Sequence, residues 1–327
     1  MIPMSKPNIG ASAQRYLSQA LKRNEIAQGV FIKEFEARFA KFIGIKHATT
    51  AANGTLAVYL ALRAIGIGKG DEVLLPSLTF AAPADAVLLT GAKPVFVDTD
   101  ADSFSLDLAS VAKYRTKRTK CILAVDLYGV PCDIKSLRRF KLPIIQDSCE
   151  SLGAKVGDAD ITCFSFFGNK VMTTGEGGMA CTDSPRYKNF MDRYRNHGRA
   201  SGYWHELSGI NARMSNLTAA LGLSQLEDLP ANLRQRRKIL GWYGFTNPQK
   251  VGPWVMWVRR PDKARVVARL NTHKIQARIG FHPLHTMPAY RQKKHLPGAE
   301  RLGREIVLLP LFPQLTQKEV QYILSKL

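Results

Sequence analysis

The chain has 327 residues, 45% of them hydrophobic, which is enough for a large core and for one large domain plus a smaller one. Its 47 lysines and arginines against 26 aspartates and glutamates give a net charge of +21, which favours anionic partners. No stretch reaches the ~18 apolar residues of a membrane span, and residues 1–10 lack the basic start and apolar run of a signal peptide. These features disfavour a membrane protein and predict a cytoplasmic location.

The basic residues and the cysteines narrow the class of protein further. The five cysteines are odd in number and form no CxxC pair, so they predict reduced, mostly buried thiols rather than disulfides or a zinc site. The basic clusters lack the aromatic interleaving of a nucleic-acid-binding surface. Nucleic acid is therefore disfavoured as a partner, and solvated faces that attract phosphorylated substrates are the plainer interpretation. The clusters are residues 113–120, 135–141, 234–238 and 291–294.

Apolar runs in the first two thirds of the chain predict short buried strands. A helical pattern at 81–92 and a turn-rich stretch at 100–115 separate the first three runs, as expected of crossover connections in a mostly parallel sheet. The predicted fold class is therefore α/β. The runs are residues 71–77, 93–98, 121–129, 143–148 and 161–167.

The last third of the chain predicts a second, smaller domain. Pro230 and the basic stretch after it are interpreted as a boundary, and the segments 252–260, 266–278 and 319–327 indicate a small α+β domain. We predict a large domain over residues 1–235 and a small domain over residues 236–327.

Neither common nucleotide-binding fingerprint is present. The segment GIGKG at 66–70 precedes a predicted strand, whereas a dinucleotide fingerprint follows a strand and opens a helix, and no GxxxxGK[ST] occurs. NAD and ATP chemistry are therefore disfavoured.

Lys170 lies in the segment SFFGNKVMTTGEGGM (165–179), between an aromatic strand end and a run of glycines. Burying an ammonium group costs several kcal/mol, so a lysine in this setting indicates an amine kept for chemistry. A neutral lysine amine forms a Schiff base with an aldehyde, and the cofactor that uses this bond as an electron sink is pyridoxal 5′-phosphate. That cofactor also needs a carboxylate at its pyridine nitrogen, donors for its phosphate and a flat face for its ring.

Each of these needs has a candidate. Asp147 ends the apolar run 143–147, and open α/β sheets collect their sites at the carboxyl ends of strands; taken alone, it could equally be a helix cap. Asn53, Gly54 and Thr55 directly precede an apolar helical pattern, where amides and a hydroxyl can bind phosphate, although an ordinary N-cap would look the same.

Two further candidates complete the set. Ser165 offers a second phosphate hydroxyl, and Phe80 could cover the ring. Alone, the serine would be interpreted as structural and the phenylalanine as core. The joint order of all these residues along the chain is what makes the pattern specific.

In that order the sequence resembles the DegT/DnrJ/EryC1/StrS family of sugar aminotransferases over nearly its whole length. Seven blocks carry the resemblance: EFEARFAKFIGIKHATTAANGTLAVYLAL, GDEVLLPSLTFAAPADAVLLTGAKPVFVD, QDSCESLGA, FSFFGNKVMTTGEGGM, RNHGR, YWHELSGINARMSNLTAALGLSQLE and LPGAERLGREIVLLPLFP.

The resemblance implies a type I aminotransferase fold, with a mostly parallel mixed sheet in the large domain, and a homodimer with shared active sites. It implies that Lys170 is the Schiff-base lysine and proton shuttle, that Asp147 is the pyridinium partner and that Glu150 lies near the ring hydroxyl. Cofactor contacts would come from Asn53, Gly54, Thr55, Phe80 and Ser165, and Asn211 would reach the phosphate from the neighbouring subunit.

The resemblance also implies a reaction. L-Glutamate would be the amino donor and a nucleotide-linked ketosugar the acceptor, and ESLG with FFGNK…TTGEGG looks most like the perosamine-synthase group, which acts at C4 of a GDP-linked 4-keto-6-deoxy sugar. UDP- or dTDP-linked ketosugars, aminated at C4 or C3, and keto-cyclitols are the alternatives. From another class, a retired enzyme that binds polyanions through its basic surface is a further alternative.

Substrate contacts are expected from the segment 281–290, with His285 and Tyr290 as candidates. His282 and His285 could also be interpreted as a metal pair, but the intervening proline and the lack of nearby carboxylates disfavour a metal site.

Overall fold

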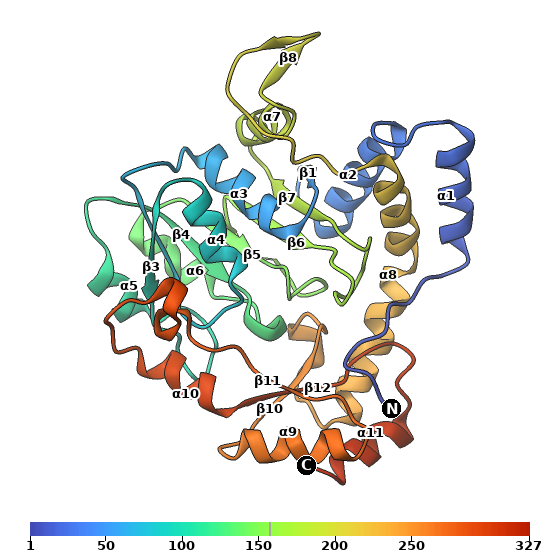
Figure 1. The fold of residues 1–327 in the computed structure, drawn as a ribbon, viewed down its shortest axis with the longest axis vertical. Helices are drawn as coiled ribbons and strands as arrows, with labels where there is room; N and C mark the ends of the chain where they lie inside the picture. Colours follow the sequence, from blue (N-terminus) through green and yellow to red (C-terminus); the bar gives the residue numbers. More distant parts are fainter. Residues whose placement is uncertain (157) are drawn as a thin grey trace.

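A seven-stranded mixed sheet organises the computed structural model, which describes residues 1–156 and 158–327 (Figure 1). The strand order is β1-β7-β6-β5-β4-β2-β3. Strands β2 to β6 pair in parallel, and β7 pairs antiparallel with both β6 and β1. The strands are β1 His47–Ala51, β2 Glu72–Pro76, β3 Lys93–Val97, β4 Thr119–Val125, β5 Ile144–Asp147, β6 Ile161–Ser165 and β7 Gly178–Thr182.

The five strands that the apolar runs predict are β2 to β6, and their parallel pairing is confirmed. Every residue of β2 and β5 is buried, as expected of parallel strands with both faces covered. The sequence pattern did not predict β1 and β7. Strand β1 consists of small and polar residues and β7 begins with a glycine, so neither is a continuous apolar run. Both strands lie beyond β6 in the sheet.

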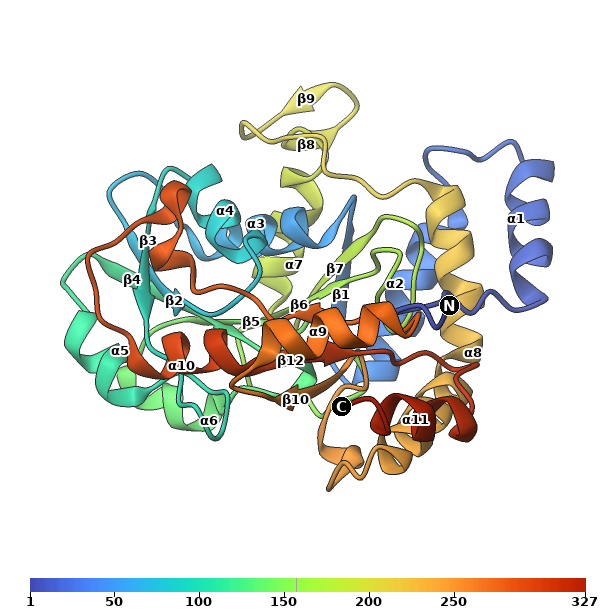
Figure 2. The same cartoon turned by 60° about the horizontal axis from the view of Figure 1, so that its bottom comes forward.

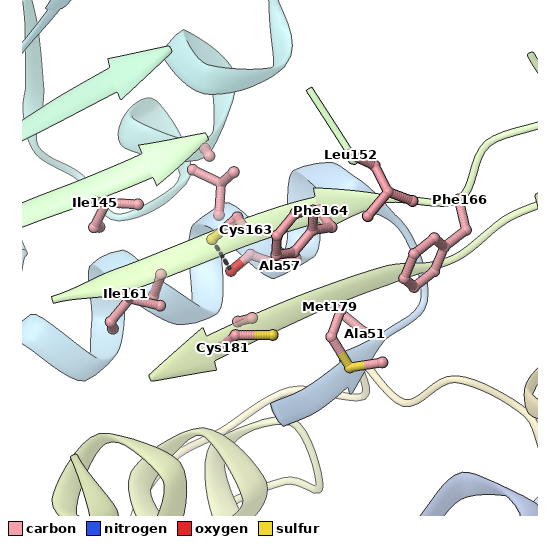
Figure 3. Packing of buried hydrophobic residues seen from close by; sticks show 14 of the residues in the cluster. Ala51, Ala57, Ile145, Leu152, Ile161, Cys163, Phe164, Phe166, Met179 and Cys181 are labelled. Carbon is pink, nitrogen blue, oxygen red and sulfur yellow. Dashed lines mark hydrogen bonds between the residues drawn. The ribbon is translucent and has the colours of Figure 1, made fainter. Parts of the chain in front are cut away.

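Helix α3 packs against β5, β6 and β7 and brings its N-terminus to the sheet's carboxyl edge. Figure 3 shows this packing around Ile145, Ile161 and Cys163, whose thiol donates to the carbonyl of Ala57 at 3.6 Å. The other helices of this part are α1 Ser12–Lys22, α2 Val30–Ile43, α3 Gly54–Ile65, α4 Ala82–Leu89, α5 Leu108–Tyr114, α6 Ile134–Leu137 and α7 Pro185–Tyr194.

A second, three-stranded antiparallel sheet of order β10-β12-β11 has its own apolar core. Ile2 pairs with Ile275 beside this sheet, and Figure 2 shows both ends of the chain there. An α+β unit after residue 252 agrees with the sequence pattern. Its elements are β10 Met256–Arg259, α9 Lys263–Thr272, β11 Arg278–Ile279, α10 Pro297–Glu305, β12 Ile306–Leu309 and α11 Gln317–Leu324.

Helix α8 (Asn216–Trp242) joins the two parts and runs unbroken through Pro230, so this proline marks no break in the secondary structure. A proline inside a helix removes one hydrogen bond, but α8 buries residues on both sides of it, including Leu226 and Leu233, and packs along α1 and α2. That packing outweighs the local penalty. The division after residue 235 falls inside this helix and stays a prediction.

A short hairpin of β8 (Arg199–Ser201) and β9 (Trp204–His205) projects from the body of the molecule (Figures 1 and 2). At its tip Tyr203 is 92% exposed and Trp204 is 70% exposed. Large aromatic side chains left in water are a feature of interaction surfaces. Within the described residues, no helix is both long and apolar enough to span a membrane.

Gly178 lets β7 approach the start of α3. A Cβ at this position would lie 2.3 Å from the Asn53 carbonyl oxygen, so we expect Gly178→Ala to lower the free energy of unfolding by about 1–3 kcal/mol. Gly241→Ala is the control, because a Cβ there meets nothing within 4 Å, and it should stabilise α8 by up to about 1 kcal/mol. Urea unfolding of both variants compares the two; equal effects would contradict the close approach.

Candidate active site

A cavity of about 550 Å³ opens at the carboxyl ends of the parallel strands, where sites of open α/β sheets form. Eight of the residues predicted for a single site line it together, although they come from four separate segments of the chain. They are Asn53, Gly54, Thr55, Phe80, Asp147, Glu150, Ser165 and Lys170.

The N-terminus of α3 forms one wall of the cavity. Asn53 caps the helix, its side-chain oxygen accepting from the Leu56 amide at 2.9 Å, while Gly54 and Thr55 are the first residues of the helix, whose amides have no partner within it. A Cβ on Gly54 would lie 2.8 Å from the Cβ of Ser165. The glycine therefore lets helix amides and a serine hydroxyl converge on one point, as an anion site requires.

Lys170 faces this wall with its side chain only 14% exposed. Its Nζ lies 3.9 Å from Oε1 of Glu150 and 4.1 Å from the ring centroid of Trp254. The indole of Trp254 donates to the carbonyl of Asn169 at 3.1 Å, which fixes the ring beside the lysine. The amine is thus held between a carboxylate and an aromatic face.

Two carboxylates that line the cavity, Asp147 and Glu150, are buried. Burial raises the pKa of Asp147, against the opposing effect of hydrogen bonds from Cys149 and the charge of Lys170; the Cys149 amide donates to its Oδ1 at 3.0 Å. Burial likewise raises the pKa of Glu150 to about 7, against Lys170 and the amide of Tyr128. Strong pKa shifts in a cavity are typical of catalytic sites.

Phe80 stands at the cavity with 59% of its surface exposed. Its ring packs on Phe281 with a centroid distance of 6.0 Å, and Phe281 stacks on Tyr128 at 5.1 Å. The hydroxyl of Tyr128 accepts from the Phe281 amide at 2.6 Å. This aromatic series supports Phe80 in a position to cover a flat ligand.

The predicted substrate residues His285 and Tyr290 do not line the cavity. His285 is 3% exposed, with Nδ1 2.6 Å from the Ser77 hydroxyl and Nε2 3.4 Å from a carboxylate oxygen of Glu300. Tyr290 donates to Asp85 at 2.6 Å. The hydrogen bonds to Ser77 and Asp85 attach the segment 281–290 to the large domain. The local sequence does not reveal these partners, because they lie far away along the chain.

Asn211 also lies away from the cavity of its own chain. It is exposed and bridges to Asn196, next to the projecting β8–β9 hairpin. Its predicted role in a neighbouring subunit's site remains a prediction.

Several side chains that line the cavity were not predicted from the sequence, among them Cys149, Trp254 and Arg278. Cys149 lies two residues after Asp147 and directly before Glu150, and that spacing could have indicated it. Trp254 and Arg278 come from the small domain, and no local signal in the sequence connects them to Lys170.

These residues fit pyridoxal 5′-phosphate. The gap at Gly54, which a Cβ would fill, and the free helix amides suit the phosphate, and the buried carboxylate of Asp147 suits a protonated pyridine nitrogen. The exposed face of Phe80 suits the ring, and Lys170 Nζ suits the aldehyde carbon.

The comparisons with known proteins agree with this geometry. GDP-perosamine synthases from Caulobacter vibrioides and Escherichia coli O157:H7 are 38% and 36% identical, covering 100% and 98% of this chain and 97% and 96% of theirs. The solved structure of the putative sugar aminotransferase Spr1654 from Streptococcus pneumoniae, in its PMP form, matches with a TM-score of 0.91 at 25% identity, over 100% of this chain and 98% of the other.

An α/β fold with a lysine, buried carboxylates and a helix N-terminus around one cavity is the arrangement that an aminotransferase site needs. The chain belongs to the DegT/DnrJ/EryC1/StrS aminotransferase family, whose model matches residues 7–327. The predicted family, the type I aminotransferase fold and the predicted enzyme class are therefore confirmed.

Glu150 gives the cofactor-free protein a defined pH dependence. Its pKa is raised from 4.5 to about 7, so between these pH values the folded chain binds more protons than the unfolded chain and stability falls as pH rises. The loss is up to about 3 kcal/mol, and Glu150→Gln should remove it.

Urea unfolding at pH 5 and pH 7.5 measures this contribution. Glu176→Gln is the control, because Glu176 also lines the cavity but is exposed, and it should unfold with the wild-type pH dependence. A Glu150→Gln variant whose stability varies with pH as wild type does would rule out Glu150 as the source.

Proposed function

We propose that this chain uses pyridoxal 5′-phosphate to transfer the amino group of L-glutamate to C4 of a GDP-linked 4-keto-6-deoxy sugar. The observation that carries the proposal is the arrangement of Lys170 between Glu150 and Trp254, facing the α3 N-terminus across one cavity. The choice of sugar rests on the GDP-perosamine synthases to which the whole chain is similar.

Within this proposal the chain's own residues do the following. The amides of Gly54 and Thr55 and the hydroxyl of Ser165 hold the cofactor phosphate, and Asp147 holds a proton on the pyridine nitrogen. The bound cofactor supplies an electron sink for the carbanion that remains when a substrate carbon loses its proton. Lys170 Nζ takes the α-proton of L-glutamate and later returns a proton to C4 of the sugar.

Glu150 and Trp254 keep the Lys170 amine at the reaction centre. The carboxylate at 3.9 Å and the indole face at 4.1 Å restrict where the side chain can swing. A lysine that must act on two substrates in turn gains rate from such restricted geometry.

The first experiment is visible absorption of the purified protein with added pyridoxal phosphate. Wild type should gain a visible band that L-glutamate bleaches, while Lys170→Ala should show neither the band nor amino transfer, with a loss of at least about a thousandfold in kcat because the proton carrier is gone. Lys188→Ala is the control, since that lysine pairs with Glu36 and Asp192 and does not line the cavity.

The acceptor is then identified by single-turnover assays with GDP-, UDP- and dTDP-linked 4-keto-6-deoxy sugars. Preference for the GDP sugar supports the proposal, whereas preference for another nucleotide or for a 3-keto sugar or keto-cyclitol would replace the substrate and keep the reaction. A protein with no band under any condition would overturn the function and leave the polyanion-binding alternative to be tested by salt-dependent DNA binding.

We further propose a homodimer in which Asn211 of one chain completes the cofactor site of the other. Its exposure and its position at the base of the projecting β8–β9 hairpin support this assignment. Each site would then take Lys170 from one chain and Asn211 from the other, so the two contributions can be removed separately, each on a different chain.

Mixing Lys170→Ala with Asn211→Ala chains tests the shared site. Random reassociation should regenerate native sites in the mixed dimers, up to about a quarter of the wild-type number, so activity should rise above that of either variant alone. Cofactor retention should also be weaker in Asn211→Ala by itself. No gain on mixing, with dimers present by light scattering, would contradict an Asn211 that acts across the interface.

A further inference from the structure

A third buried carboxylate, Asp126, lies outside the cavity lining. Asp126 directly follows β4, is 1% exposed and accepts hydrogen bonds on both oxygens. Oδ1 accepts from the Cys132 amide at 2.9 Å and from Gln146 at 3.1 Å, and Oδ2 accepts from Gln146 at 3.0 Å, Ser148 at 2.8 Å and Ser151 at 2.5 Å. Each of these donors is neutral.

Three of the four donor residues lie in the segment 146–151, which also carries Asp147 and Glu150. This segment comprises the end of β5 and the residues that follow it, and is called the loop 146–151. Gln146, Ser148 and Ser151 point to Asp126, whereas Asp147, Cys149 and Glu150 line the cavity. The backbone makes the same connection, since the Asp126 amide donates to the Asp147 carbonyl at 3.0 Å. The loop 146–151 thus has one face on the cavity and one face on Asp126.

The hydrogen bonds to Asp126 restrict this loop strongly. Hydrogen bonds to an ionised acceptor are shorter and stronger than neutral ones, and a buried carboxylate that loses its donors carries a large penalty. Moving Asp147 or Glu150 relative to the sheet would break the bonds from Ser148 or Ser151. Asp126 therefore opposes displacement of the two groups that the proposed reaction needs at fixed positions.

We propose that Asp126 is a positioning residue of this enzyme, which holds Asp147 and Glu150 in place for the cofactor and for Lys170 by anchoring the opposite face of the loop 146–151. The proposal rests on the proposed function. Asp126 touches neither the cavity nor the lysine, and it acts only through its neighbours.

The charge of Asp126 has a second effect on the same loop. The ionisable groups that face Glu150 are Lys170, Asp147 and Asp126, and the negative charge of Asp126 helps to raise the pKa of Glu150. Asp126→Asn removes this charge and also places an amide group where serine hydroxyls donate. The variant should therefore show both a looser cofactor site and a lower pKa for Glu150.

Two measurements on Asp126→Asn test the proposal. The dissociation constant for pyridoxal phosphate, from the visible band, should rise at least about fivefold, because a buried donor loses its partner. In the cofactor-free protein, a carboxyl-carbon NMR titration of ¹³C-labelled glutamate, assigned with Glu150→Gln, should show the Glu150 midpoint at lower pH than in wild type.

Asp100→Asn is the matched control. Asp100 also accepts from a serine hydroxyl and two amides, but it is exposed in a turn, so both measurements should match wild type. If Asp126→Asn does not fold, Ser151→Ala removes one donor and keeps the carboxylate, and it should raise the same dissociation constant about twofold or more.

A merely structural role predicts a lower Tm with an unchanged dissociation constant and an unchanged Glu150 midpoint, and either unchanged value would overturn the proposal. Failure of the proposed function looks different, because wild type itself would then not bind pyridoxal phosphate. The Glu150 titration would still decide in that case whether Asp126 acts on the loop.

Discussion

Three buried carboxylates and one amine at the carboxyl edge of β4 and β5 set the main constraint on this site. Burial raises the pKa of Asp126 to about 6, that of Glu150 to about 7 and that of Asp147 as well. Ionised groups of this kind persist in a protein interior only with charge partners or hydrogen bonds. The loop 146–151 therefore cannot be exchanged for any other tight loop. The Gln146 amide and the two serine hydroxyls donate to Asp126, while Asp147 and Glu150 are presented to Lys170.

Trp254 reaches the site from beyond helix α8, and Arg236 on that helix holds its backbone. Arg236 is fully buried, and burial lowers its pKa to about 10. Its guanidinium donates to the carbonyls of Pro253 at 3.3 Å, Trp254 at 3.4 Å and Leu311 at 2.8 Å. Helix α8 thereby fastens the backbone of the residue whose ring covers the lysine, so the position of the small domain and the surroundings of the amine are mechanically linked.

Much of the fold could be predicted from the sequence because β2 to β6 are continuous apolar runs and helical patterns lie in the connections from β2 to β3 and from β3 to β4. The eight predicted residues of the cavity could be brought together because each follows a strand or opens a helix. Trp254, Arg278, His285 and Tyr290 could not be placed, since their positions depend on how the small domain docks, and residues far apart in sequence decide that. Asp126 follows the strand β4 as Asp147 ends β5, yet its part in the site depends on serines whose direction only the structure shows.

Cys149 is the cysteine of the cavity that a reagent can reach, because the other four cysteines are buried. Of the five free thiols, Cys121, Cys132, Cys163 and Cys181 are buried and Cys149 is partly exposed, with its side chain lining the cavity beside Gly54 and Asp147. A small thiol reagent would therefore label Cys149 first, and a bound ligand would shield it. The natural protein thus carries its own attachment point for a reporter group inside the cavity, with no cysteine to remove beforehand.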